Sequence, residues 1–271
     1  MSIADKLQII TENVPKVYSK GFADGYSDGE TNGKDLGNQE AYDAFWNAIQ
    51  KNGSRVNYEN AFSNASWCTE SFKPLYKIKP TYALSLFKNS SLMVEEDAKR
   101  IDLIALAEET GFEFDFSECT NLGYAFADAG CIKTIGEVDV RLCTGGGSLS
   151  YAFYGGYGGY YKTEIKKIIC NEDSQFNATT FANLTKLVEI RFEGTIGKTA
   201  ITFASSTKLS HDSLVSIINA LSSTTSNLTI TLSKTSVNNA FETSDGTANG
   251  STSSEWASLI ATKPNWTISL G

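Results

Sequence analysis

Residues 181–190, FANLTKLVEI, contain the unit from which the fold can be predicted: an aromatic residue, a short turn, an apolar residue and the start of a strand. Similar tripeptides end at four phenylalanines, which are separated by 27, 28 and 22 residues. They are Phe126, Phe153, Phe181 and Phe203. Self-similarity at such periods is typical of repeat proteins, in which one unit is too thin to bury its apolar face and stacked neighbours share a core.

The residues that follow each phenylalanine also match. An aliphatic residue stands six positions later in three of the four units. The pairs are Phe126 with Ile132, Phe181 with Leu187, and Phe203 with Leu209. In the remaining unit the aliphatic residue, Ile165, comes six residues late, and the run YGGYGG at 154–159 has that length. The common offset favours a stacked β-rich solenoid with one surface insertion over chance placement of the phenylalanines.

The segments on either side of the repeats have patterns of their own. Residues 112–116 alternate phenylalanine with acidic residues, which predicts a strand with one buried face. Ser210 is a good N-cap for a helix that carries Leu214, Ile217, Ile218 and Leu221. We further expect strands at 228–232 and 266–270, a helix at 256–260 and a loop over 242–254. This strand–helix–strand ending should cap the stack and shield its open edge.

The N-terminal residues predict a helical segment. Leu7, Ile10, Val14 and Val17 recur at spacings of 3, 4 and 3, which places them on one face of a helix over residues 1–19, although Pro15 should interrupt it. A short helix with so narrow an apolar face is not stable alone in water. We therefore expect a homo-oligomer, with a trimer favoured. Glycine recurs every fourth residue from 21 to 37, which indicates either a close-packing helical stripe or a flexible linker. A helix at 39–50 follows.

Several runs resemble a known family. NLGYAF at 121–126 and FANLTKLVEI at 181–190 are similar to the BspA-like branch of leucine-rich repeats. ADKL at 4–7, YDAFW at 42–46 and NWTISL at 265–270 resemble proteins encoded by phages and prophages of gut Firmicutes, in which a helical anchor carries a BspA-like repeat domain. The resemblance implies a virion or tail-associated role.

Together these patterns predict a β-rich α/β protein, a leucine-rich-repeat-like solenoid with an N-terminal helical segment able to form a coiled coil. We expect four parts. They are an anchor or oligomerisation segment at 1–53, an irregular N-terminal cap at 54–110, the solenoid at 111–210 and a C-terminal α/β cap at 211–271.

Composition excludes some classes of partner. The formal net charge is −8 and no basic stripe is present, so nucleic-acid binding is not expected. The sequence has no long apolar run and no secretory signal pattern, so we expect neither membrane insertion nor export through such a signal. The five cysteines lack CxxC spacing and are expected in the core of a protein made in a reducing cytoplasm.

The sequence gives little sign of catalysis. The one histidine, His211, stands at the start of a predicted helix and is expected to be an ordinary surface residue. TGGGS at 144–148 lacks the lysine of a phosphate-binding loop. Carboxylate pairs at 95–96, 108–109 and 115/118 are typical of an acidic surface. We therefore assign no catalytic residue, no metal site and no cofactor.

Tyrosines interleaved with glycine are the best candidates for ligand binding. They are Tyr154, Tyr157, Tyr160 and Tyr161, whereas Tyr151 is assigned to the core because it belongs to a repeat tripeptide. Tyrosine offers a flat apolar face and a polar tip, which suits recognition of proteins and sugars. The alternative is that some of these tyrosines fill the core while the glycines form a tight turn.

The expected function follows from the resemblance and this candidate site. It is a non-enzymatic phage tail-associated protein, receptor-binding or structural, made in the host cytoplasm and located in the virion. Its expected partners are its own copies, other virion proteins and a glycan or protein of the bacterial surface. The alternatives are a BspA-like cell-surface adhesin and a glycan-cleaving enzyme on a β-solenoid.

Overall fold

The computed structural model describes residues 56–64, 78–90, 100–112, 114–156, 162–197, 199–224, 227–241 and 250–271. The chain forms two compact units, Met1–Ser54 and Arg55–Gly271, and every described residue belongs to the second. The predicted helices at 1–19 and 39–50 and the glycine-rich stretch between them lie outside the described residues, as do Leu7, Ile10, Val14 and Val17.

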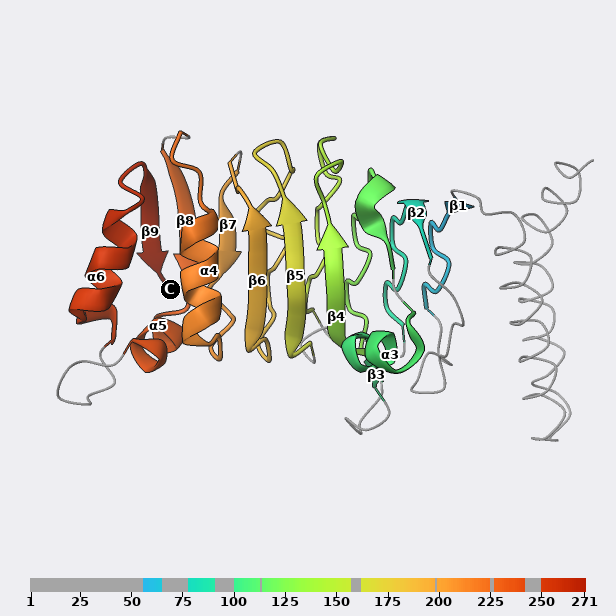
Figure 1. The fold of residues 1–271 in the computed structure, drawn as a ribbon, viewed down its shortest axis with the longest axis horizontal. Helices are drawn as coiled ribbons and strands as arrows, with labels where there is room; N and C mark the ends of the chain where they lie inside the picture. Colours follow the sequence, from blue (N-terminus) through green and yellow to red (C-terminus); the bar gives the residue numbers. More distant parts are fainter. Residues whose placement is uncertain are drawn as a thin grey trace, which may run out of the picture. The chain divides into compact units, whose positions relative to one another are not determined.

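The second unit is a mixed α/β fold built on parallel sheets. Its strands are β1 (Val56–Asn57), β2 (Pro80–Tyr82), β3 (Ile101–Asp102), β4 (Ile132–Asp139), β5 (Glu164–Cys170), β6 (Glu189–Gly194), β7 (Ile201–Phe203), β8 (Leu228–Leu232) and β9 (Trp266–Leu270). They form three sheets, in the orders β1-β2, β3-β4-β5-β6 and β7-β8-β9. Within each sheet, strands that follow one another in the chain lie side by side (Figure 1). The predicted α/β class is confirmed.

Four α-helices occur among the described residues. They are α3 (Leu103–Thr110), α4 (His211–Ala220), α5 (Lys234–Ala240) and α6 (Ser254–Ala261), and two short 3-10 turns are η2 (Phe116–Glu118) and η4 (Gly250–Thr252). The helices near Ser210 and residue 256 and the strands at 228–232 and 266–270 were predicted, and the structure confirms them. Helix α5 was missed because Val237 is its one large aliphatic residue, so no apolar periodicity indicates it.

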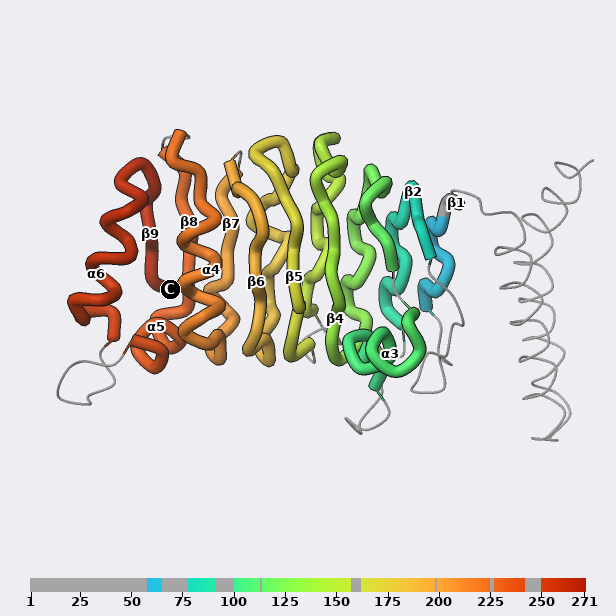
Figure 2. Tube along the Cα trace, viewed as in Figure 1, coloured from blue at the N-terminus to red at the C-terminus, as the bar shows by residue number. Residues whose placement is uncertain are grey.

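A second series of hydrogen bonds joins the turn segments that carry the phenylalanines. The backbone N–H groups of Phe62, Phe87, Phe126 and Phe153 donate to the carbonyl oxygens of Leu86, Ala125, Ala152 and Thr180, at 2.8, 2.6, 2.8 and 3.0 Å. The chain trace shows these segments alternating with the sheet strands (Figure 2). Each of these segments is therefore bonded to the next one along the chain, in addition to the pairing of the strands.

The phenylalanines of these segments stack into one buried column. The column runs Phe62, Phe87, Phe126, Phe153, Phe181, Phe203, and its successive ring centroids are 4.9, 5.8, 5.7, 5.3 and 4.9 Å apart. The interplanar angles lie between 4° and 20°, and each side chain is at most 4 % exposed. Stacked rings at this separation gain more than their area burial alone. The four phenylalanines of the sequence repeat thus share one environment.

Two members of the column were not predicted. Phe62 and Phe87 fall in residues 54–110, where we expected an irregular cap. The hydrogen bonds between turn segments and the ring stacking already occur in this region. Phe87 and Phe126 are 39 residues apart because helix α3 occupies part of the interval. An insertion of this kind changes the period without changing the stack, so a search at a fixed spacing overlooks it.

The predicted strand at 112–116 is only partly correct. Phe112, Phe114 and Phe116 are all buried, as the alternation requires. However, Phe114 forms a single bridge with Ile78, and η2 begins at Phe116. The turn is started by Asp115, whose carboxylate accepts a hydrogen bond of 3.0 Å from the N–H of Ser117. Aspartate stabilises a local turn of this type in competition with an extended strand.

Helix α4 covers the open edge of the four-stranded sheet. The hydroxyl oxygens of Ser213 and Ser216 accept the N–H groups of Ile190 and Phe192 on β6, at 2.9 and 2.8 Å. The carbonyl oxygen of Val188 accepts from the N–H of Ser210 at 2.9 Å. Serine side chains thus replace the strand that would follow β6. The predicted shielding of an edge occurs here, at β6, rather than at the end of the described residues.

Removing both hydroxyls should expose that edge. We expect Ser213→Ala with Ser216→Ala to lower the free energy of unfolding by about 2 kcal/mol, because two N–H groups lose their acceptors. Urea denaturation measures this loss, and hydrogen exchange should accelerate at the Ile190 and Phe192 amides. Ser258→Ala, which removes an exposed hydroxyl bonded within α6, is the control and should change stability by less than about 0.5 kcal/mol. Unchanged exchange at both amides would contradict the capping role.

Candidate functional site

One phenylalanine-bearing segment and the residues leading to the next such segment are called a coil below. Tyr124 and Tyr151 occupy equivalent places in successive coils, two residues before the buried Phe126 and Phe153. Both tyrosines have a left-handed backbone, with φ of 57° and 55°. This conformation costs a residue with a bulky side chain about 1–2 kcal/mol. The next residue in each coil is a buried alanine, so the tyrosine side chain is directed outward and is partly exposed.

The backbone itself does not require tyrosine at this place. The two preceding coils have Asn60 and Ser85 there, with φ of 58° and 57°. Asparagine tolerates the left-handed conformation because its short amide side chain bonds locally. Two neighbouring tyrosines in this conformation are therefore more easily explained by what their side chains do at the surface.

These tyrosines belong to a continuous surface feature, the tyrosine ridge, formed by Lys88, Tyr124, Tyr151, Tyr154 and Asn183. The rings of Tyr124 and Tyr151 stack at 4.9 Å and 15°, and Tyr154 meets Tyr151 edge to face at 5.1 Å. At one end the Lys88 ammonium lies 4.4 Å from the centroid of the Tyr124 ring. At the other end the Asn183 amide donates to the Tyr154 hydroxyl at 3.1 Å. The ridge thus crosses several coils.

Two glycines allow the coils to approach closely beside the ridge. The N–H of Gly155 donates to the carbonyl oxygen of Ala182 at 2.9 Å. A Cβ on Gly155 would lie 2.2 Å from the backbone oxygen of Asn183, and one on Gly156 would lie 2.4 Å from the Asp128 carboxylate. The first contact is with backbone and cannot relax easily. The glycines interleaved with tyrosine therefore serve close packing between coils.

The ridge contains one of the four predicted ligand-binding tyrosines. Tyr154 lies in it, while Tyr157, Tyr160 and Tyr161 lie outside the described residues. The assignment of Tyr151 to the core was wrong, because this side chain is partly exposed and stacks on the surface. Sequence reasoning missed Tyr124, although its tripeptide Tyr-Ala-Phe is identical to that of Tyr151 and could have identified it.

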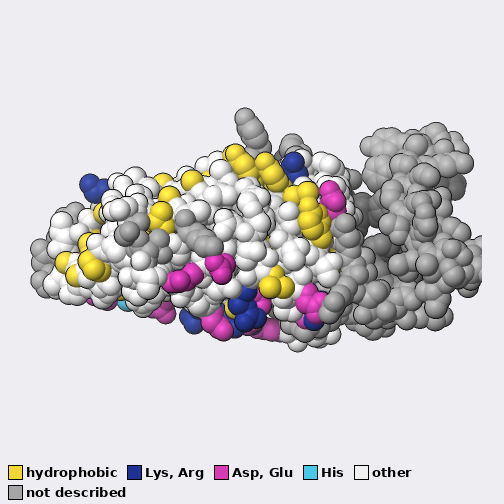
Figure 3. All heavy atoms as spheres, turned by 90° about the horizontal axis from the view of Figure 1, so that it is seen from above, with side chains coloured by type: hydrophobic (Ala, Val, Ile, Leu, Met, Phe, Trp, Pro, Cys, Tyr) yellow, Lys and Arg dark blue, Asp and Glu magenta, His cyan; other side chains and the backbone are white. Residues whose placement is uncertain are grey.

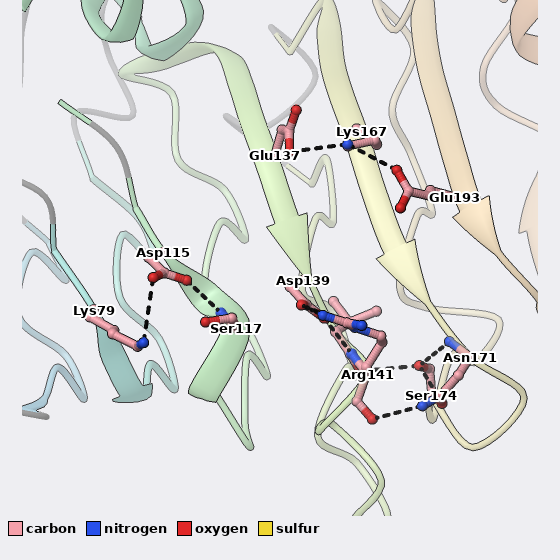
Figure 4. Close-up of polar contacts among 11 residues, drawn as sticks. Lys79, Asp115, Ser117, Glu137, Asp139, Arg141, Lys167, Asn171, Ser174 and Glu193 are labelled. Carbon is pink, nitrogen blue, oxygen red and sulfur yellow. Dashed lines mark hydrogen bonds and ion pairs between the residues drawn. The ribbon is translucent and has the colours of Figure 1, made fainter. Parts of the chain in front are cut away.

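Several charged side chains on or beside the four-stranded sheet form ion pairs. The Lys167 ammonium on β5 lies 3.2 Å from the Glu137 carboxylate on β4 and 2.9 Å from that of Glu193 on β6 (Figure 4). At the end of β4, Arg141 binds Asp139 at 2.6 Å, also in Figure 4. The Lys167 contacts join three strands, and the Arg141 contact lies where the chain leaves β4. These carboxylates therefore have structural partners.

Two of the three carboxylate pairs noted in the sequence lie among the described residues. Asp115 and Glu118 both contact the Lys79 ammonium, at 3.6 and 3.0 Å. Glu108 and Glu109 are exposed on α3. The pair at 95–96 lies outside the described residues.

His211 connects two helices. Its Nε2 atom lies 2.7 Å from a Glu255 oxygen on α6, and its Nδ1 atom lies 3.4 Å from an Asp212 oxygen. The hydrogen bond to Glu255 raises the pKa of His211, with a smaller contribution from Asp212. The ring also packs against Phe241 at 4.7 Å. These contacts connect α4 with α6 and with Phe241, which follows α5.

The four described cysteines are buried, as expected for core residues. They are Cys119, Cys131, Cys143 and Cys170, all unpaired, while Cys68 lies outside the described residues. Burial raises the pKa of Cys119 to about 11 and that of Cys170 to about 12, and it also raises the pKa of Cys143. Such thiols stay protonated near neutral pH and are poor nucleophiles.

The described residues contain no group of three or more histidine, cysteine, aspartate or glutamate side chains arranged to hold a metal ion. None of the described helices is long and apolar enough to cross a membrane. Comparison of the chain with protein-family models, with curated proteins and with solved structures found no match.

Proposed function

We propose that residues 56–271 form a leucine-rich-repeat-like solenoid. Its coils share one phenylalanine column, and successive strands are parallel and adjacent. In such a fold each coil contacts mainly its neighbours, so surface side chains from several coils can form one extended binding face. The tyrosine ridge is a face of this kind.

We further propose that the solenoid is a non-enzymatic binding module that contacts the bacterial surface, as part of a phage tail-associated protein with a receptor-binding or structural role. The observation that carries the proposal is the stacked, partly exposed pair Tyr124 and Tyr151, both in a backbone conformation that is unfavourable for tyrosine. Tyrosine edges and hydroxyls beside the Asn183 amide suit the hydroxyl groups of a glycan. The tail-associated role is supported by the sequence resemblance.

The N-terminal segment has its own part in the proposal. Leu7, Ile10, Val14 and Val17 would hold copies of the chain together, with a trimer favoured, and residues 1–53 would attach the protein to other virion proteins. A cell-surface adhesin of the BspA type would use the same ridge from the bacterial side. The binding experiment therefore tests what the two roles share.

Asparagine substitutions in the ridge provide the test. We expect Tyr124→Asn and Tyr151→Asn each to weaken binding of the full chain to cell-wall polysaccharides from gut Firmicutes at least about tenfold, which corresponds to about 1.4 kcal/mol. Asparagine is the residue found at the equivalent position 60, so the left-handed backbone is kept. Thermal unfolding should show no loss of stability, because a strained tyrosine is replaced by a tolerant residue. Biolayer interferometry gives the affinities.

The matched control is Tyr82→Asn, which removes a partly exposed tyrosine outside the ridge and should leave binding unchanged. Equal binding by the wild-type chain and both ridge variants would exclude the ridge as the contact surface. Release of soluble sugars from the polysaccharides would overturn the non-enzymatic role in favour of glycan cleavage.

A further inference from the structure

The last strand, β9, has one unpaired edge. It pairs with β8, and no described strand pairs with it on the other side. The N–H of Gly271 donates to Leu232 at 2.9 Å and its carbonyl accepts from Lys234 at 3.0 Å, so both groups of Gly271 are directed at the β8 segment. Because the direction alternates along a strand, the N–H and C=O groups of Ile268 and Leu270 are directed away from β8.

This edge differs from the edge at β6. Serine hydroxyls of α4 bond the outer N–H groups of β6. Strand β9, with the sequence WTISL, has no charged residue and no proline, the usual features that keep an exposed edge from pairing. The edge at β6 is therefore capped, whereas β9 has the composition of a strand that pairs.

Partly exposed apolar side chains lie on both α6 and β9. Leu259 and Ile260 on α6 and Ile268 and Leu270 on β9 are all partly exposed. The space-filling view shows hydrophobic side chains at the end of the molecule where Figure 1 places α6 and β9 (Figure 3). A second molecule that added a strand to β9 would also cover part of this surface.

We propose that β9 pairs in antiparallel register with β9 of a second copy of this chain. The alternation of apolar and polar residues is symmetric about Ile268. An antiparallel copy centred there sets Trp266 opposite Leu270, Thr267 opposite Ser269, and Ile268 opposite itself, so apolar faces apolar and polar faces polar. The two outward groups of each Ile268 then exchange two hydrogen bonds. A contact of this kind is closed by a two-fold axis.

This dimer goes beyond the proposed binding function and does not depend on the N-terminal helix. If that helix also assembles copies, each assembly has several β9 edges, and pairing joins it to at least one further assembly. The expected result is therefore a ratio: the full wild-type chain has at least twice the mass of the Ile268→Pro variant in sedimentation velocity at micromolar concentration. Proline removes the outward N–H and leaves intact those that bond β8.

Ile268→Ala is the matched control, because it removes the same side chain and keeps the N–H. It should retain the mass of the wild-type assembly, whereas Ile268→Pro should lose it with an unchanged far-ultraviolet circular dichroism spectrum. Ile268→Cys supplies an independent readout: mild oxidation should link two chains through position 268, while Thr267→Cys should not. Equal mass for wild type and Ile268→Pro, together with no cross-link at position 268, overturns the proposal.

Discussion

Replacing Lys162 by methionine should stabilise the protein, raising the free energy of unfolding by about 1–3 kcal/mol. Lys162 has no exposed surface. Thr134 pairs with Glu164, and Glu164 pairs with Glu189. Ile132, Lys162 and Leu187 each lie two residues before these strand positions, so they form one row across the neighbouring coils. Both neighbours in the row are fully buried. A lysine thus stands where the adjacent coils place aliphatic core residues, and methionine fills a similar volume without a charge.

The physical cause is desolvation of the ammonium group. Burial lowers the pKa of Lys162 to about 8 from 10.5, although Cys131 and Asp128 act in the opposite direction. At 1.36 kcal/mol per pKa unit, this difference corresponds to a penalty of about 3 kcal/mol for folding with the lysine protonated. Asp128 is partly exposed, so water can solvate its carboxylate when the ammonium is removed.

The same shift predicts a pH dependence with a definite sign. Between pH of about 8 and 10.5 the unfolded chain keeps the Lys162 proton and the folded chain does not. Stability contributed by this group therefore rises with pH across that window and is lost as pH falls through about 8. The buried thiols act in the opposite direction in wild type and variant alike. The stability difference between Lys162→Met and wild type should thus shrink as pH rises from 7 to 10.

The neighbours in the row supply the control. Ile132→Met and Leu187→Met exchange one apolar side chain for another at the adjacent positions and should cost up to about 1.5 kcal/mol. Urea denaturation at several pH values measures all three variants. If Lys162→Met destabilises the protein as these two do, the buried ammonium contributes favourable interactions that outweigh its desolvation.

Lys162 also shows where sequence reasoning stops. A lysine in a run of lysines is read as surface, and only the register across β4, β5 and β6 reveals that it occupies a core row. Ile132 and Leu187 were predicted to be equivalent because they share an offset from phenylalanine. Ile165 was predicted as their counterpart in the unit with the insertion, and this was wrong, because Ile165 pairs with Ile135 and Ile190. Lys162 holds that place instead, so the insertion shifts the row by three residues rather than six. The offset identified the row, but not the residue that occupies it in the inserted coil.

The candidate site was predictable only in part for a related reason. Aromatic enrichment around Tyr154 indicated a surface feature, whereas the stacking of Tyr124 on Tyr151 depends on which residues successive coils bring together. The hydrogen bonds that cap β6 could not be predicted either. Nothing in the helix sequence shows that an unpaired strand lies beside Ser213 and Ser216. Local sequence patterns predicted the helices and strands. The surface ridge and the edge caps depend on contacts between coils, which local patterns do not specify.

The second large effect concerns the phenylalanine column. We expect Phe153→Ala to lower the free energy of unfolding by about 3–5 kcal/mol, because a fully buried ring is lost and its cavity cannot collapse easily. The rings on either side, Phe126 and Phe181, lie 5.7 and 5.3 Å away at 7° and 4°, so both stacking contacts disappear together. Equilibrium unfolding in urea should show a lower midpoint with an unchanged slope.

The adjacent residue gives the matched comparison. Tyr154→Ala removes a partly exposed ring from the same segment and should cost no more than about 1 kcal/mol. Phe153→Leu should fall between the two, because it keeps apolar volume and loses the stacking geometry. The order of the three losses tests whether the phenylalanine column, from which the repeat was recognised in the sequence, stabilises the fold. If Phe153→Ala costs no more than Tyr154→Ala, the column does not hold the coils together, and stability must come from the parallel strands instead.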